Sequence, residues 1–465
     1  MTEHTKTAIT KARALLEEAV VSYMGRPVGT VAALDPGLEA LNYDQVFTRD
    51  FAVSAFALLL EGRDDIVRNF LELAVELQSS ERQFDCFKPG QGLIPASFKV
   101  ETVDAGQRLA ADFGEHAIAR VAPVDSGFWW LLTLQAYGRA TGDTTLVRTP
   151  PFQEAIRLVL DLSLVTRFDM FPTMLVPDGS FMIDRRMGVY GYPIDIQAQF
   201  YAALCAARRL LVADEPANAE YVAAVEERLG HLAYHLRTYY WLDLERLNQV
   251  YRYGVEEYGP TAANQFNIQP EAIPDWLMDW LPEGGGYFAG NVGPGRLDYR
   301  FFAQGNLLAS AAGLATPEQT AAIMALYAAH RDDLLGEMPL KLCFPALAGQ
   351  EWRILTGCDP KNRPWSYHNG GNWPMLLWLF AIVALEAGDQ ELLETALHDA
   401  ERRLVREDWP EYFDGRAGRL VGRYARRRQT WTAAGYLVAR QLLEHPERAA
   451  WLRLGDHVDA ASCST

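Results

Sequence analysis

Residues 373–389 read WPMLLWLFAIVALEAGD, and this stretch decides the fold class. No charged side chain occurs between positions 373 and 385, so a helix formed there has no face suited to water and must be buried on all sides. Gly388 then favours a left-handed helix end, and Asp389 favours the start of the next helix. The stretch therefore predicts a buried helix that turns sharply into a second helix.

The same pattern recurs along the chain. Apolar helices without a polar face are expected at 51–60, 128–136, 196–211, 301–312 and 431–443. Each of these except the last is followed, like the stretch at 373–385, by a short turn and a helix with a single apolar stripe. The last apolar helix lacks such a partner, and a helix at 7–23 is free to close the ring. Six buried helices inside six half-exposed ones predict an all-α, (α/α)6 toroid, formed as a single domain by residues 1–465.

The charge and composition of the chain exclude several classes of function. The chain has 465 residues and a formal net charge of −17, which argues against nucleic acid and anionic membranes as partners. Its five cysteines are scattered and form no CxxC pair, as expected of reduced thiols. The first residues are polar, and the longest apolar stretch, 375–385, is too short to span a bilayer. We expect a cytoplasmic protein that forms a homo-oligomer.

The connections between helix pairs are long, whereas the turns within pairs are short. The long segments cover 24–47, 80–124, 166–191, 241–298, 335–370 and 405–428. Long connections in a compact domain are usually functional. In a toroid, all six would emerge at the end where the inner helices begin, so we expect the functional site at that end.

These segments are rich in aromatic rings, carboxylates and arginines, which suit a neutral ligand with many hydroxyl groups. Glycoside hydrolysis requires two carboxyl groups that flank the scissile bond. Asp184 lies in the third segment and Glu411 in the sixth, and these two segments face each other across a sixfold ring. The opposition favours this pair, although the spacing alone leaves Asp178 and Asp414 open.

Structural roles compete with each of these assignments. Asp184 is followed by Arg185 and Arg186, and most such neighbours form ion pairs. Positive charge also lowers the pKa of a carboxyl group, whereas a general acid needs a raised pKa. For Asp50 and Asp125, which lie near helix starts, capping is the simpler interpretation.

Histidines give little sign of a metal site. His231 and His235 lie one helical turn apart, but the glutamate of a zinc-protease motif and a third ligand are missing. A structural pair is the favoured interpretation, and no metal or organic cofactor is expected. His368 lies beside Asn369 in a long segment and is a better candidate for the site.

Long motifs connect the chain to a known family. They are NYDQVFTRDF from 42, LIPASFKV from 93, ADFGEHAIARVAPVDSGFWW from 111, MIDRRMGVYGYP from 182, YRYGVEEY from 251, GGYFAGNV from 285, GEMPLKLCFPAL from 336, GCDPKNRPWSYHNGGNWP from 357 and WPEYFDG from 409. With these motifs in the same order, the chain resembles the neutral/alkaline invertases, glycoside hydrolase family 100.

The resemblance implies an (α/α)6 barrel that hydrolyses sucrose to glucose and fructose with inversion. It places the general acid at Asp184 and the general base at Glu411. It further implies a binding set for the two sugars: Tyr43, Asp50, Asp125, Arg186 and His368 for the glucosyl unit, and Arg426 for the fructosyl unit. We add two aromatic residues, Trp129 and Tyr253, as expected substrate contacts. A sugar isomerase with His368 or His116 as base, and a silent sugar-binding protein, remain as alternatives.

Overall fold

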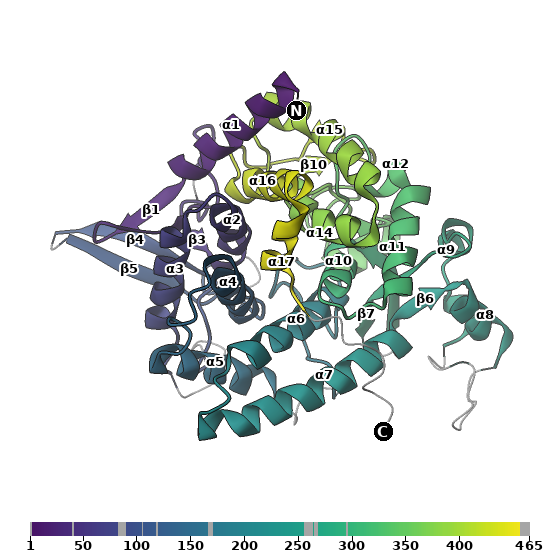
Figure 1. The fold of residues 1–465 in the computed structure, drawn as a ribbon. Helices are drawn as coiled ribbons and strands as arrows, with labels where there is room; N and C mark the ends of the chain where they lie inside the picture. The colour runs from purple at the N-terminus through teal and green to yellow at the C-terminus, as the bar shows by residue number, and fades with distance from the viewer. Residues whose placement is uncertain are drawn as a thin grey trace.

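The computed structural model describes residues 2–39, 41–81, 90–104, 106–117, 120–165, 171–254, 264, 268–293 and 296–455. Six helices form an inner ring: α2 (Thr48–Leu60), α4 (Ser126–Thr141), α6 (Ile194–Leu210), α10 (Ala303–Ala311), α14 (Leu377–Ala387) and α16 (Thr430–Glu444). Each packs against the next, and α16 packs against α2, so the ring closes (Figure 1).

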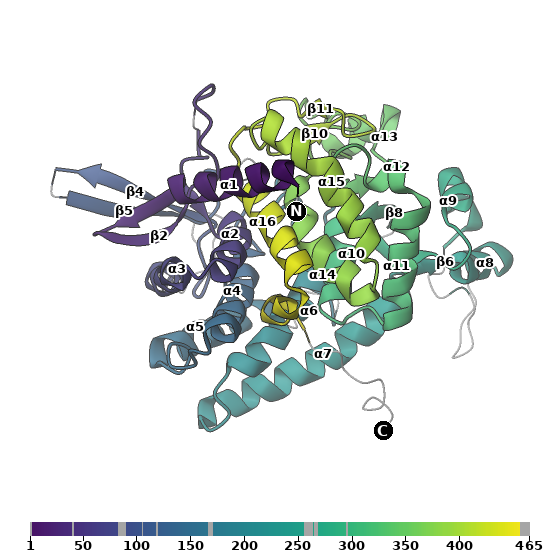
Figure 2. The same cartoon turned by 45° about the horizontal axis from the view of Figure 1, so that its top comes forward.

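An outer layer of helices surrounds this ring. It consists of α1 (Glu3–Glu18), α3 (Asp64–Leu77), α5 (Pro150–Ser163), α7 (Ala219–Tyr239), α11 (Pro317–Ala329) and α15 (Gln390–Arg406). The N-terminal helix α1 packs against α15 and α16, where the last inner helix has no partner of its own (Figure 2). The predicted (α/α)6 arrangement, including the helix that closes it, is confirmed.

Burial explains the two layers. In α14, every residue from Leu377 to Ala384 is buried, whereas α3 buries one apolar stripe that includes Ile66 and Phe70. Gly388 ends α14 with a φ of 80°, a conformation that is costly for residues with a Cβ atom. Helix α11 begins with a capping box, in which Thr316 and Gln319 exchange hydrogen bonds of 3.2 and 3.1 Å.

The long segments contain strands that the sequence patterns did not predict. Residues 20–23 form β1 (Val20–Tyr23) rather than the end of a helix, because β-branched residues there pair with β2 (Arg26–Thr30) around a turn at Gly25. Residues 301–302 end a strand instead of starting α10. The further strands are β3 (Val46–Phe47), β4 (Ser97–Val103), β5 (Gly106–Asp112), β6 (Trp241–Asp243), β7 (Gly286–Gly293), β8 (Arg296–Phe302), β9 (Cys343–Phe344), β10 (Phe413–Asp414) and β11 (Leu420–Val421).

All described strand pairs are antiparallel. Strands β3, β4 and β5 form one sheet, and β6 to β9 form a second sheet in sequence order. The short helices of the connections are α8 (Leu244–Arg252), α9 (Asp275–Trp280), α12 (Arg331–Leu334), α13 (Gly349–Thr356) and α17 (Ala449–Leu452). The 3-10 turns are η1 (Pro216–Asn218), η2 (Pro270–Ala272), η3 (Pro374–Leu376) and η4 (Pro446–Arg448).

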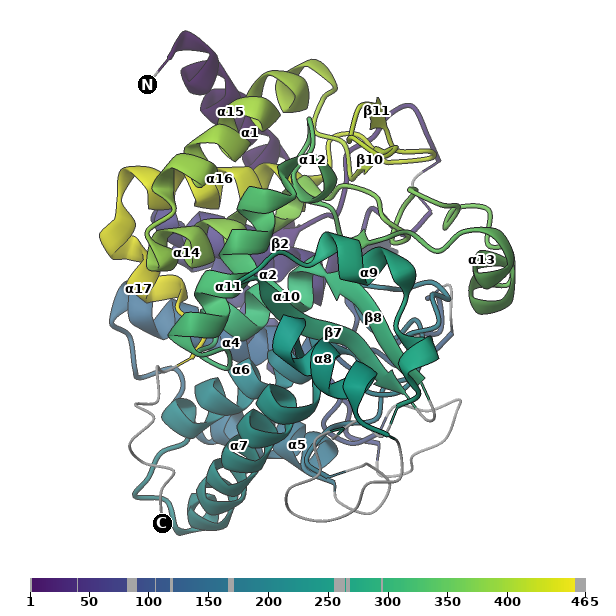
Figure 3. The same ribbon diagram turned by 90° about the vertical axis from the view of Figure 1, so that its right-hand side faces the viewer.

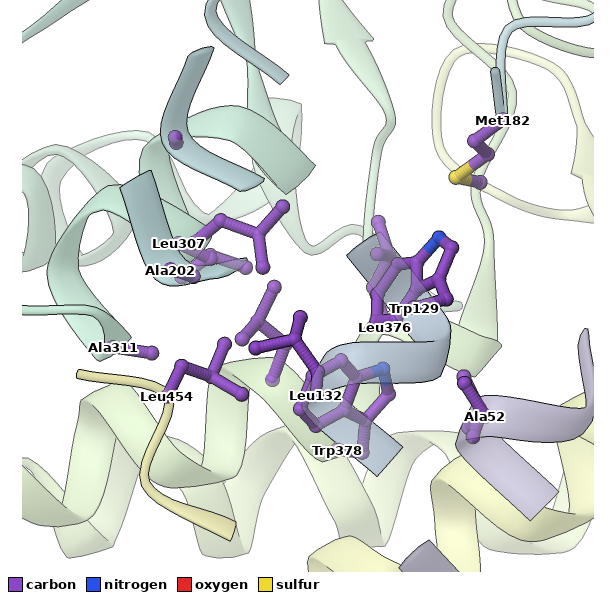
Figure 4. Close-up of a cluster of buried hydrophobic side chains, with 14 of the residues drawn as sticks. Ala52, Trp129, Leu132, Met182, Ala202, Leu307, Ala311, Leu376, Trp378 and Leu454 are labelled. Carbon is purple, nitrogen blue, oxygen red and sulfur yellow. The ribbon is translucent and has the colours of Figure 1, made fainter. Parts of the chain in front are cut away.

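The two ends of the ring differ. Helix α17 lies at one end, whereas β10, β11 and α13 lie at the other end (Figure 3). Between them the interior is apolar, with Trp129, Leu132 and Trp378 among the side chains that fill it (Figure 4). Within the described ranges, none of the helices combines the length and apolar character needed to traverse a lipid bilayer.

Candidate active site

A cavity of about 710 Å³ opens at the end of the ring where α2, α4 and α16 begin. Its described lining comes from five of the six long segments and from the first residues of the helices that follow them. Seven of the ten predicted site residues line it: Tyr43, Asp50, Asp125, Asp184, His368, Glu411 and Arg426. The site therefore lies at the expected end, with both predicted carboxyl groups in one cavity.

Glu411 is held firmly in this cavity. Its backbone N–H donates to the carbonyl oxygen of Arg426 at 2.8 Å, and its side chain is almost fully buried. The phenol of Tyr43 donates a hydrogen bond of 2.8 Å to Oε1. The other oxygen, Oε2, lies 3.7 Å from Nζ of Lys361 and accepts no hydrogen bond from the described residues. One carboxylate oxygen is thus occupied while the other is open.

Asp184 lies in the same cavity within a tightly folded loop. The hydroxyl of Tyr367 donates to its Oδ1 at 3.3 Å, and Nδ1 of His368 lies 3.7 Å from the same oxygen. The loop is shaped by Asp178, whose carboxylate accepts the backbone N–H groups of Met187 at 3.1 Å and Gly188 at 2.9 Å. Asp178 therefore has a structural role outside the cavity lining.

Asp414, the other carboxylate that the spacing left open, also lies outside the lining. Its Oδ1 accepts the backbone N–H of Gly415 at 2.8 Å, within the turn that follows β10. The geometry therefore separates the predicted pair, Asp184 and Glu411, from both rivals.

Burial in the cavity raises the pKa of Asp184, and the nearby charge of Glu411 raises it further. Arg49, Lys361 and Arg185 oppose this rise in pKa without cancelling it. Arg185 is itself engaged by both oxygens of Asp359, at 3.0 and 2.9 Å. The neighbouring arginine is thus paired with another carboxylate, and the pKa of Asp184 stays raised, as a general acid requires.

The imidazole of His368 is fully buried, and burial lowers its pKa well below the ordinary value. The positive charges of Lys361, Arg49 and Arg185 lower this pKa further. His368 is therefore a neutral ring at physiological pH, able to exchange hydrogen bonds but poorly suited to hold an abstracted proton.

Asp50 and Asp125 do not cap their helices through their side chains. Asp125 instead accepts a hydrogen bond of 2.7 Å from the buried guanidinium of Arg49. Burial raises the pKa of Asp50 to about 7 against the opposing charge of Arg49, with Glu411 and Asp184 adding to the rise. Both carboxyl groups are directed to the cavity wall, where they can contact sugar hydroxyls.

Three predicted contacts are absent from the described lining. Trp129 lies on the core side of α4, with its ring centroid 6.3 Å from that of Trp378 (Figure 4). Arg186 is exposed, and its guanidinium donates to the carbonyl oxygen of Ile354 at 3.3 Å. Tyr253 follows α8 and is 39% exposed. The structure does not place these three residues at the cavity.

The fourth segment as a whole supplies no described residue of the lining. Its strands β7 and β8 pair with β6 and β9 in the four-stranded sheet beside α11, which draws this segment away from the cavity. His231 and His235 lie on the outer helix α7, where His235 packs against Tyr239 with a centroid distance of 4.9 Å.

Sequence reasoning missed several residues of the site. Arg49, Lys361 and Tyr367 all line the cavity and contact its carboxyl groups or their neighbours. Arg49 carried a usable signal, because a charged residue at the start of an otherwise apolar helix needs a buried partner. Lys361 and Tyr367 lie in the 357–374 motif but had no spacing that distinguished them.

Buried polar atoms without a partner among the described residues gather around this cavity. They are Arg49 Nε, Asp125 Oδ1, Arg185 Nε, His368 Nδ1, Glu411 Oε2, Gln429 Oε1 and Trp431 Nε1. Each such atom costs roughly 1–3 kcal/mol if it stays unsatisfied. The set mixes donors and acceptors, as a sugar requires. In the described part of the chain, no cluster of three or more His, Cys, Asp or Glu side chains is placed to hold a metal ion.

Comparison with known proteins finds plant invertases among the relatives of this chain. The chain is 53% identical over 442 residues to cytosolic invertase 1 of Oryza sativa subsp. japonica, covering 94% of this chain and 78% of that protein. It is 52% identical over 446 residues to the mitochondrial alkaline/neutral invertase C of Arabidopsis thaliana, covering 94% and 67%.

Among solved structures, a family 63 mannosylglycerate hydrolase from Thermus thermophilus shares the fold. The TM-score is 0.54 at 14% identity, with 93% of this chain and 99% of that chain covered. The sequence model described as alkaline and neutral invertase matches residues 12–446. The chain therefore belongs to the alkaline and neutral invertases, a family of glycoside hydrolases.

Proposed function

We propose that this enzyme hydrolyses sucrose to glucose and fructose by a single displacement that inverts the glucosyl carbon. Family membership supports the substrate. The observation that carries the mechanism is the pair of carboxyl groups in one cavity, Asp184 and Glu411, whose surroundings differ. Two carboxyl groups with different environments are what separate acid and base roles require.

Asp184 is the general acid and Glu411 the general base. The raised pKa of Asp184 keeps its proton available for the fructosyl oxygen as the glycosidic C–O bond breaks. Glu411 accepts the hydrogen bond of Tyr43, which orients its carboxylate, and takes a proton from the water that attacks the glucosyl carbon. The new C–O bond forms on the opposite face of the sugar, and both carboxyl groups recover their state through solvent.

Side chains around the pair bind the two sugars. Asp50, Asp125 and the neutral His368 contact glucosyl hydroxyls, since their buried polar atoms face one cavity. Arg426 stacks on Tyr43, with its guanidinium carbon 4.7 Å from the ring centroid. From this position it donates hydrogen bonds to the fructosyl unit. The cation is thereby fixed beside the leaving group.

The alternative of a sugar isomerase needs a histidine base. Burial and three nearby cations lower the pKa of His368 far below neutrality, which makes it a poor proton acceptor. His116 lines the cavity, but its side chain is 76% exposed, in a position that leaves it open to water. These observations favour hydrolysis over isomerisation.

Proton NMR of the purified protein with sucrose tests the mechanism. β-Glucose as the first anomer supports inversion, whereas α-glucose as the first anomer overturns the role of Glu411. Asp184→Asn and Glu411→Gln should each lower kcat by about 10²–10⁴-fold or more, while calorimetry still detects sucrose binding. Glu391→Gln, on the exposed face of α15, serves as the control with unchanged turnover. Full activity of either site variant would refute the assignment.

We also propose a cytoplasmic location and a homo-oligomeric state. The rice relative named as cytosolic supports the location, although the Arabidopsis relative is named as mitochondrial. Cell fractionation tests the first proposal, and light scattering coupled to size-exclusion chromatography tests the second.

A further inference from the structure

Lys361 lines the cavity beside Glu411 and Tyr367. Its Nζ is 3.7 Å from Oε2 of Glu411 and 3.8 Å from the centroid of the Tyr367 ring. The hydroxyl of the same tyrosine donates to Oδ1 of Asp184 at 3.3 Å. The lysine side chain is only 12% exposed. One buried cation therefore contacts the base directly and the acid through one aromatic ring.

We infer that Lys361 is a positioning residue whose ammonium attracts Oε2 of Glu411 and leaves this oxygen free to accept the proton of the attacking water. The inference rests on the proposed function, since it assigns the proton transfer to one oxygen of the proposed base. It explains why Glu411 has two unlike oxygens rather than a symmetric pair.

The distances support this division of roles. Oε1 is occupied by the hydrogen bond from Tyr43, whereas Oε2 receives no hydrogen bond from the described residues. At 3.7 Å, the ammonium of Lys361 is beyond ordinary hydrogen-bond distance from Oε2 but close enough for strong electrostatic attraction at a buried position. The cation thus favours the negative charge without using the lone pairs that the water needs.

Several titratable groups lie close enough to Glu411 to interact with its charge. Its titratable neighbours include two acidic groups and three phenols: Asp50, Asp184, Tyr43, Tyr367 and Tyr412. The two acidic groups add negative charge near Glu411, whereas the phenols stay neutral because burial raises the pKa of each.

The other cations of the site are engaged elsewhere. Arg49 pairs with Asp125, and Arg185 pairs with Asp359. Arg426 lies over the ring of Tyr43. Among the residues that the structure describes, Lys361 supplies the only ion pair to Glu411 within 4.0 Å. The stacking of its ammonium on Tyr367 restrains it, because cation–π attraction is stronger away from water.

The pH dependence of Lys361→Met tests the inference. Because this substitution removes the cation beside Oε2 of Glu411, the acidic limb of the kcat profile should move to higher pH by about 1–3 units. The basic limb should also move to higher pH, by a smaller amount. Lys361 lowers the pKa of Asp184, so its removal lets Asp184 keep its proton to a higher pH. We expect kcat to fall more than KM rises. Lys361→Arg retains the charge and should keep both limbs near their wild-type positions.

Lys6→Met provides the matched control, because Lys6 is a surface residue of α1. If Lys361→Met does not fold, Lys361→Gln gives the same measurement with a polar side chain. An acidic limb that stays in place in the neutral variants, or that moves equally in Lys361→Arg, overturns the inference. If Asp184→Asn and Glu411→Gln are inactive but the acidic limb of Lys361→Met does not move, only the role of Lys361 is refuted. An active Glu411→Gln variant refutes the proposed function itself.

Discussion

Tyr43 and Glu411 are separated by 368 positions in the sequence, yet the phenol of one donates a hydrogen bond of 2.8 Å to the carboxylate of the other. They come from the first and the last long segments, which meet because α16 packs against α2 and closes the ring. Arg426 covers the face of the Tyr43 ring, and the backbone of Glu411 is anchored to the same arginine. The orientation of the proposed base is therefore set by ring closure.

Removal of this hydrogen bond should impair catalysis without unfolding the protein. Tyr43→Phe leaves Oε1 of Glu411 without its donor, and a hydrogen bond to a charged group contributes about 1.5–3 kcal/mol, so kcat should fall by about 10–100-fold. Steady-state kinetics on sucrose measure the effect. Tyr234→Phe, on the exposed side of α7, should retain wild-type kcat. An unchanged kcat in Tyr43→Phe would show that Glu411 is oriented by other contacts.

Release of Arg185 should shift the basic limb of the pH profile. In Asp359→Asn, Arg185 loses its carboxylate partner, and its uncompensated charge lowers the pKa of Asp184. A general acid with a lower pKa loses its proton earlier, so the basic limb should move to lower pH by about 0.5–1 unit. Asp399→Asn, which breaks the surface pair with Arg331, is the control. A shift to higher pH would contradict the proposed electrostatics.

Asp50 should reduce stability as the pH rises. Its pKa of about 7 in the folded protein exceeds the ordinary value of 3.8, so the folded state binds more protons between these values. The free energy of unfolding therefore decreases as pH rises from about 4 to 7, and the loss is complete above 7. Asp50→Asn removes this effect, so its Tm should exceed that of the wild type more at pH 8 than at pH 5. Calorimetry at both values checks the difference, with exposed Asp389→Asn as control.

Trp129 should matter for stability and not for sugar binding. It is buried in the ring interior beside Trp378, and truncation of a buried tryptophan usually costs about 3–5 kcal/mol. Denaturant unfolding of Trp129→Ala should show this loss, while KM for sucrose stays within about twofold. Tyr253→Ala, at an exposed position, should change neither quantity measurably. A large rise in KM for Trp129→Ala would restore this residue to the binding set.

Much of the fold was predictable because burial leaves a direct trace in sequence. A helix such as α14 has no polar face, and Gly388 marks its end, so the layers and their order follow from composition and turn chemistry. The strands were not predictable in this way. Strands β3, β10 and β11 have two residues each, and their pairing depends on contacts between distant segments rather than on local alternation.

The residues of the candidate site likewise include some that the sequence predicted and some that it did not. Asp184 and Glu411 followed from opposition across the ring and from long motifs, and both line the cavity. The exposed position of Arg186 could not be predicted from the sequence. Arg185 and Arg186 are adjacent and look alike in sequence, and only the fold determines which of them points into the cavity. Arg185 lines the cavity and Arg186 is exposed. Lys361 was likewise hidden, since its role depends on the distance to a residue 50 positions away in the sequence.

The closed ring supports the proposed active site as a whole. The described cavity wall comes from five connections, and each is attached to a different part of one continuous circle of helices. Disruption of the circle at any point, including the loss of α1 from its place beside α16, would separate the segments that form the cavity wall. Thermal inactivation and global melting should therefore coincide, and proteolytic halves should regain activity only by reassembling the circle.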